Sequence, residues 1–187
     1  MLKRLITTLS AICICVSAFA QRTAYGERML SLTGSWTISS VGGEIRYGQY
    51  LMSGFWFGGL SLANRVEIDA PTGEFVHYPH LQGGGGYMFR FWGNRTRAIN
   101  IYGGGDAFIG VEMLDLWKVL TLPTRKSFLE NGFKEYQFIY GVAPRVEFEY
   151  FPFRNIAFTI NGRVPVTLNS KFGVLAWEVG AGVKVNF

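Results

Sequence analysis

The amino-acid sequence predicts an all-β fold: a closed antiparallel transmembrane β-barrel of eight strands that follows an N-terminal signal peptide. Three observations support this prediction. The first twenty residues have the pattern of an export signal. Long segments after them alternate between apolar and polar residues, which is the period of a β-strand. The last of these segments ends the chain on an aromatic residue, Phe187.

Residues 1–20 predict a cleaved signal peptide. Lys3 and Arg4 form a charged start, an apolar stretch follows, and the small-residue sequence Ala-Phe-Ala precedes Gln21. The apolar stretch is shorter than the roughly 20 residues that a helix needs to span a bilayer, which disfavours a membrane anchor. We therefore expect a signal peptide at 1–20 and a single outer-membrane β-barrel domain at 21–187.

Composition restricts the chemistry of the mature chain. Both cysteines, Cys13 and Cys15, lie within the predicted signal peptide, so no disulfide or thiolate–metal site is expected after it. The residues before Cys13 fit an acylated lipoprotein cysteine poorly. The formal net charge of +5 is spread along the chain without a Lys/Arg cluster, so direct contact with nucleic acid is not expected. The 24 glycines and 16% aromatic residues, with only 17% charged residues, suit strands whose outer face contacts an apolar medium.

The alternating segments predict the strands in chain order. We expect strands at about residues 28–41, 45–57, 60–69, 75–92, 97–113, 134–151, 154–169 and 172–187. The stretch 45–69 is divided at Gly58-Gly59, because this pair is a plausible turn and a single-chain bacterial barrel normally has an even number of strands.

The segment from Phe138 to Tyr150 shows the alternation most plainly. Its even positions are aromatic, aliphatic or proline, whereas its odd positions include Arg145, Glu147 and Glu149. The apolar face of such a strand could contact either a soluble core or a lipid bilayer. If it contacts lipid, the charged face lines the lumen of the barrel.

The charged members of the alternating segments predict an ionic network in the lumen. They are Arg90, Arg145, Arg163 and Lys184 with Asp106, Glu112, Glu147, Glu149 and Glu178. A narrow lumen filled with side chains requires near-balanced charge, which favours the membrane barrel over a soluble sandwich. On this basis Phe148→Arg, placed near the middle of its strand, is expected to cost roughly 2–4 kcal/mol at the bilayer midplane. Glu147→Gln is expected to be milder.

The C-terminal segment predicts a signal for membrane insertion. Alternate residues back from Phe187, including Trp177, share an apolar face, whereas Lys184 and Glu178 lie on the other face. A final strand that closes on an aromatic residue resembles the signal by which outer-membrane barrels are recognised. Trp177 and Phe187 are therefore the candidate insertion residues.

Loop lengths predict the topology. With both ends of the mature chain in the periplasm, the connections 93–96 and 152–153 lie on the periplasmic side and the long loop 114–133 lies outside. Exposed loops often carry binding functions, although an inert surface loop is the alternative. The candidate partner-binding residues of this loop are Trp117, Arg125 and Lys126.

No residue pattern indicates catalysis. His77 and His80 would lie on opposite faces of a strand, so they do not form a metal pair. The glycine runs 83–86 and 103–105 lack the Lys-Ser/Thr ending of a phosphate loop. No serine is paired convincingly with a histidine, as a lipid-modifying enzyme would require. We therefore expect no catalytic residue, cofactor, metal ion or small-molecule substrate.

Several segments resemble the TraO conjugal-transfer proteins of Bacteroidota conjugative elements. They are the AFA-QR processing region, RTRAINIYGGGDAFIGVEML, FIYGVAPRVEFEYFPFRNIAFTINGRVPV and GAGVKVNF, and together they cover most of residues 75–187. The resemblance implies a non-catalytic outer-membrane component of the apparatus that moves DNA between cells. Its implied partners are outer-membrane lipid and other conjugation proteins. A small general outer-membrane barrel for adhesion or envelope integrity is the alternative.

Overall fold

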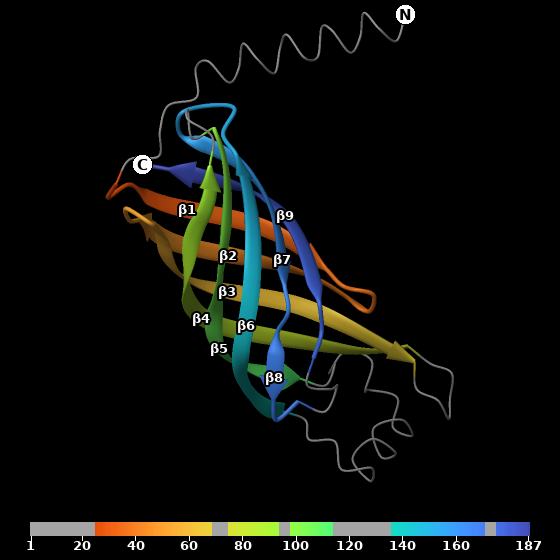
Figure 1. The fold of residues 1–187 in the computed structure, drawn as a ribbon. Coiled ribbons are helices and arrows are strands. Elements are labelled where there is room, and N and C mark those ends of the chain that lie inside the picture. The colour runs from red at the N-terminus through yellow and green to blue at the C-terminus, as the bar shows by residue number, and fades with distance from the viewer. Residues whose placement is uncertain (1–24, 69–74, 94–97, 114–135, 171–174) are drawn as a thin grey trace, which may run out of the picture.

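The computed structural model describes residues 25–68, 75–93, 98–113, 136–170 and 175–187, and they form one β-sheet (Figure 1). The expected signal peptide lies outside the described residues. The strands are β1 (Arg28–Trp36), β2 (Ser40–Tyr50), β3 (Gly54–Ile68), β4 (Phe75–Gly93), β5 (Ile99–Met113), β6 (Tyr136–Tyr150), β7 (Ile156–Arg163), β8 (Val166–Leu168) and β9 (Glu178–Asn186). Within these ranges no helix is long and apolar enough to cross a membrane.

The sheet closes on itself. The strands follow the order β5-β4-β3-β2-β1-β9-β7-β6, and β6 pairs in turn with β5. All pairings are antiparallel. β7 and β8 lie along β6 in one continuous register, since Arg163 pairs with Arg145 and Val166 with Val142. They therefore form a single barrel strand, and the prediction of a closed eight-stranded antiparallel barrel is confirmed.

The expected turn at Gly58-Gly59 is wrong, because both glycines lie within β3. The turn between β2 and β3 comprises residues 51–53, and a further turn at residues 37–39 interrupts the segment expected to be the first strand. A Cβ atom at Gly59 would lie 2.9 Å from Cγ of Arg46, whose side chain is buried inside the barrel. The glycine thus makes room for an inward-pointing side chain and does not reverse the chain.

The two ends of the barrel differ in the length of their connections. At one end, here called the termini end, the backbones of Arg28 and Phe187 exchange two hydrogen bonds of 3.0 Å. The turns at residues 51–53 and 151–155 lie at this end. The opposite end, here called the loop end, is where residues 114–135 connect β5 to β6. This asymmetry agrees with the expected topology, and the orientation of the barrel in a membrane stays a prediction.

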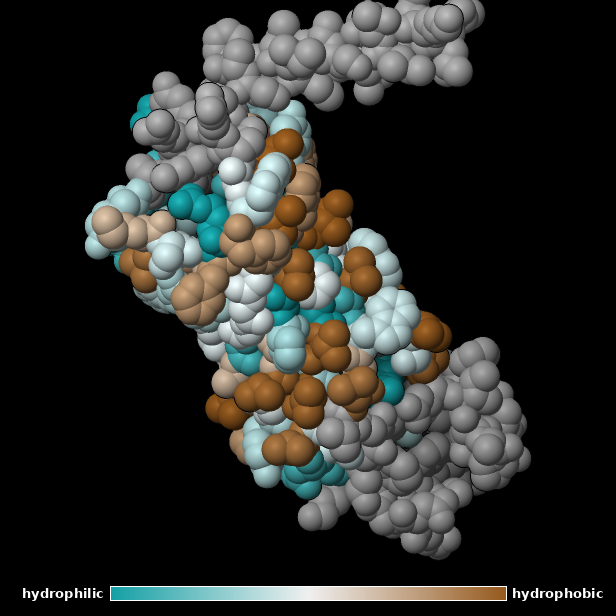
Figure 2. Space-filling view, viewed as in Figure 1, coloured by the Kyte–Doolittle hydropathy of each residue, from teal (hydrophilic) through white to brown (hydrophobic). Residues whose placement is uncertain are grey.

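Side chains alternate across the barrel wall, as β6 shows. Phe138 and Val146 are both 54% exposed, whereas Arg145, Glu147 and Glu149 are at most 2% exposed. The predicted faces of this segment are therefore confirmed. On the face in view, Figure 2 shows many apolar residues on the outer surface of the described barrel, with more polar residues among them. A wall that is apolar outside and ionic inside is the arrangement of a strand that has lipid on one side and a packed lumen on the other.

Candidate functional site

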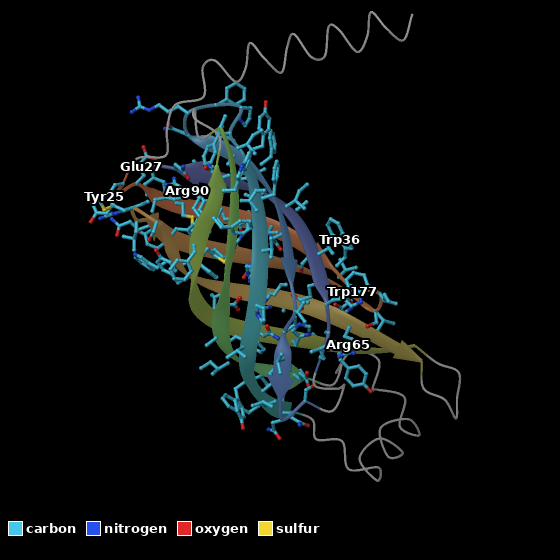
Figure 3. The ribbon with its side chains drawn as sticks, in the orientation of Figure 1. Tyr25, Glu27, Trp36, Arg65, Arg90 and Trp177 are labelled. Carbon is cyan, nitrogen blue, oxygen red and sulfur yellow. The ribbon has the colours of Figure 1, made fainter. Side chains whose placement is uncertain are left out.

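The lumen holds a continuous line of paired charges, which we call the ionic ladder. Negative and positive groups alternate along it, and each neighbouring pair lies within salt-bridge distance. From the termini end to the loop end, the ladder consists of Glu149, Lys184, Glu147, Arg46, Glu44, Arg145, Asp106, Arg163 and Glu178. Figure 3 draws the side chains of the described residues as sticks, and many of them lie between the strands of the barrel.

The termini-end part of the ladder is built on Lys184 of β9. Its Nζ atom lies 2.6 Å from Oε1 of Glu147 and also pairs with Glu149. The hydroxyl of Tyr50 donates a 2.9 Å hydrogen bond to Glu149. The Lys184 ammonium also lies 4.2 Å from the ring centroid of Phe55, a cation–π contact. These five side chains are buried, and the two carboxylates share the one ammonium group of Lys184.

The central part joins β2 to β6 across the lumen. Nη1 of Arg46 donates to Glu147 at 2.7 Å, and its Nε atom lies 3.4 Å from Glu44. Arg145 binds Glu44 through two parallel hydrogen bonds of 2.8 and 2.9 Å. Such bidentate pairs are stronger and more specific than single ones. Both guanidinium groups lie 5.3 Å from the ring centroid of Phe57, so one aromatic ring on β3 supports two cations.

The loop-end part passes from Arg145 to β9. Nε of Arg145 lies 3.2 Å from Asp106, which in turn accepts a 2.8 Å hydrogen bond from Arg163. Arg163 also lies 3.4 Å from Glu178. Asp106 therefore bridges two arginines from neighbouring strands and places a negative charge between them.

Seven of the nine residues expected in the lumen network lie in the ladder. Two lie elsewhere. Arg90 lies at the termini end, where it donates to the backbone oxygen of Met52 at 3.3 Å. Glu112 lies at the loop end and accepts a 2.8 Å hydrogen bond from Ser170. The sequence alternation extended to both positions, but alternation says which face a side chain is on and not how far along the barrel it lies.

Glu44 and Arg46 were missed by the sequence analysis. A signal for them exists, because Val41, Ile45 and Tyr47 alternate with them and are exposed on the outer wall. The strand containing them was expected to start at residue 45, and its register was not assigned. Their inclusion gives the ladder four basic and five acidic residues.

The other predicted site residues have separate positions. Trp117, Arg125 and Lys126 lie outside the described residues. Trp177 and Phe187 lie just beyond opposite ends of β9 and are 50% and 62% exposed. The two aromatic side chains are thus available to the surroundings of the barrel, and their role in insertion remains a proposal.

A polar recess of about 60 Å³ lies at the loop end, next to the last residue of the ladder, Glu178. Thr37, Ser40, Thr167 and Glu178 are among the residues that line it. Among the described residues, no cluster of three or more His, Cys, Asp or Glu side chains is placed to hold a metal ion.

The packed ladder predicts that the barrel does not conduct. Arg46, Glu147, Glu149 and Lys184 are fully buried within the lumen, so they leave no continuous water path through this section. We expect no stable ion current from the purified barrel in a planar lipid bilayer, with a porin in the same bilayer as the positive control. A steady open current from the wild-type chain would contradict the packed lumen.

A closed eight-stranded wall with an apolar exterior and a filled ionic lumen defines the class of small transmembrane β-barrels. The crystal structure of Neisserial surface protein A (NspA) has this fold: it matches with a TM-score of 0.54 at 14% identity, over 87% of this chain and 96% of that one. The attachment invasion locus protein Ail of Yersinia pestis matches with a TM-score of 0.48 at 12% identity, over 88% of this chain and all of that one.

A family assignment follows from residues 74–187, which match the model of the conjugative transposon protein TraO. The match covers most of the chain, from β4 to the C-terminus, so the chain belongs to the TraO family. The resemblance predicted from the sequence is confirmed. No curated protein sequence matches the chain.

Proposed function

We propose that this protein is a non-catalytic outer-membrane component of a conjugative DNA-transfer apparatus, exported by residues 1–20 and inserted as a barrel formed by residues 21–187. The observation that carries the proposal is the TraO family match over residues 74–187 on a chain that folds as a transmembrane barrel. The apolar outer wall supports contact with membrane lipid. Other proteins of the apparatus are the proposed macromolecular partners.

The filled lumen limits how the protein contributes to transfer. Buried, paired charges close the centre of the barrel, so DNA has no path through it. The proposed contribution is therefore made by the outer surfaces and ends of a rigid barrel, which acts as a scaffold or docking component. The loop 114–133, with Trp117, Arg125 and Lys126, is the proposed contact region for a partner protein.

Deletion of the gene from a donor cell tests this function. Conjugative transfer of the element is expected to fall to the background of a transfer-deficient donor and to be restored by the wild-type chain. A donor complemented with the Trp117→Ala, Arg125→Ala, Lys126→Ala variant is expected to assemble the barrel but transfer poorly. Normal transfer after deletion would refute the proposal.

The alternative, a general barrel for adhesion or envelope integrity, gives a different result in the same strains. It requires a defect in cell attachment or detergent resistance while conjugative transfer remains normal. Fractionation of the donor cells tests the location independently of the function. The protein is expected to sediment with the outer membrane. Recovery in the soluble periplasm would contradict the proposed location.

The topology predicts opposite labelling of two exposed turns in this naturally Cys-free mature chain. Ile38 in the β1–β2 turn is 87% exposed, and Met52 in the β2–β3 turn at the termini end is 80% exposed. On whole cells, an impermeant maleimide is expected to label Ile38→Cys but not Met52→Cys. Both should react after lysis, which controls for intrinsic reactivity. The reverse pattern on whole cells would invert the orientation.

A further inference from the structure

Two prolines weaken the barrel wall between β7 and β8. Hydrogen-bonded residue pairs in antiparallel strands normally exchange two backbone hydrogen bonds. Pro144 and Val164 keep one, from Val164 N to Pro144 O at 3.0 Å, because proline has no N–H. Pro165 and Ala176 likewise keep one, from Ala176 N to Pro165 O at 3.2 Å. The segment Val164-Pro165 is therefore held by single hydrogen bonds on both sides.

A groove with a volume of about 520 Å³ lies beside this segment. Gly103 of β5, Pro144 of β6 and Gly162 of β7 line its outer part together with Val146 and Trp177. Three residues of the ladder lie at its base, and two of them are buried: Arg145, Arg163 and Glu178. A Cβ atom added at Gly162 would meet no atom within 4 Å, so the hollow here is open and not filled by a neighbouring side chain. Val146 and Trp177 are 54% and 50% exposed, which places the groove on the outer wall.

The lining of the groove distinguishes between possible occupants. Glycine, proline, valine and tryptophan make up most of it, which suits a flexible apolar chain. If a second copy of the chain bound about a two-fold axis through the groove, the groove of one copy would face the same groove of the other. That contact would leave an unfilled void, which close packing disfavours. An acyl chain from the surrounding bilayer adapts to the hollow without a complementary ridge.

We propose that this outer groove is a binding site for one acyl chain of a membrane lipid. The proposal rests on the proposed membrane location of the barrel. The small residues Gly103, Pro144 and Gly162 form the hollow, and Val146, Val164 and Trp177 contact the chain along it.

Photocross-linking tests the site in the full mature chain. The protein is reconstituted in phosphatidylcholine vesicles that contain a phosphatidylcholine with a diazirine on one acyl chain, and cross-linked peptides are mapped by mass spectrometry. Cross-links are expected to be several-fold enriched on peptides containing Val164 and Trp177 relative to other outward positions. Gly162→Phe should remove this enrichment by filling the groove. Gly34→Leu is the matched control, since Gly34 is an exposed glycine on β1 whose added Cβ would make only an ordinary 3.9 Å contact.

The outcomes separate the site from the membrane location. Even labelling around the wall, or enrichment that survives in a folded Gly162→Phe variant, would overturn the acyl-chain site while leaving the membrane location intact. Covalent protein dimers through the groove would also overturn it in favour of a second copy. Complete absence of lipid cross-links in a heat-modifiable, folded sample would count against the membrane location itself, and therefore against both proposals.

Discussion

Replacing Glu147 with Gln is expected to destabilise the barrel by about 3–5 kcal/mol, the cost of removing one partner from a buried ion pair. Glu147 lies between Arg46 and Lys184, at 2.7 and 2.6 Å, and all three side chains are fully buried. Gln preserves the shape of the side chain but removes the negative charge that the two cations share. The measurement is the free energy of unfolding in urea, followed by tryptophan fluorescence of the barrel in vesicles.

Two control variants make this prediction specific. Glu112→Gln changes a partly buried carboxylate at the loop end that lies outside the ladder, and its hydrogen bond with Ser170 is retained by an amide oxygen, so it should cost less than Glu147→Gln. The double variant Glu147→Gln, Lys184→Gln removes a cation together with its anion. It should cost less than the sum of the two single variants, because paired residues are coupled. Equal stability of Glu147→Gln and Glu112→Gln would show that the ladder does not stabilise the barrel.

Replacing Val142 with Arg is expected to cost about 2–4 kcal/mol, the cost of a cation at the bilayer midplane on the lipid face of a barrel. Val142 is 56% exposed and lies near the middle of β6 (Tyr136–Tyr150). Its neighbours across the strand pairs are Ala107 and Val166, which provide no acidic partner for the introduced charge. The measurement is the same unfolding experiment, with heat-modifiable migration on gels to confirm that the variant folds.

Phe148→Arg is the matched control on the same strand and face. The expectation that Phe148 lies near the middle of its strand is wrong, because it is the third residue from the end of β6 at Tyr150. Near a membrane interface the cost of an outward Arg falls to roughly 0–1 kcal/mol. The structure therefore predicts that Val142→Arg is the more damaging of the two. Equal costs at the two depths would mean that no bilayer surrounds this strand.

The local sequence was sufficient to predict the faces of the best-defined strands. In β6 the period of two placed Arg145, Glu147 and Glu149 inside and Phe138 and Val146 outside, as the structure confirms. Side-chain direction along a strand depends on the backbone of that strand alone, so it is visible in a few consecutive residues. The closed eight-stranded fold was predicted from the repeated alternation and from the even number of strands that single-chain barrels normally have. One of the expected turns was misplaced.

The sequence did not determine which charges meet, because that depends on the register and closure of the whole sheet. Arg46 and Glu147 are 101 residues apart, and their strands β2 and β6 are not neighbours in the sheet. Their contact requires strands from opposite sides of the lumen to be set at the correct height, which no local pattern specifies. For the same reason the sequence suggested that Glu147→Gln would be mild, whereas the structure shows two buried cations on that one carboxylate. Alternation assigned the charges to the lumen; only the tertiary structure paired them, because the pairs form across the barrel and not along the chain.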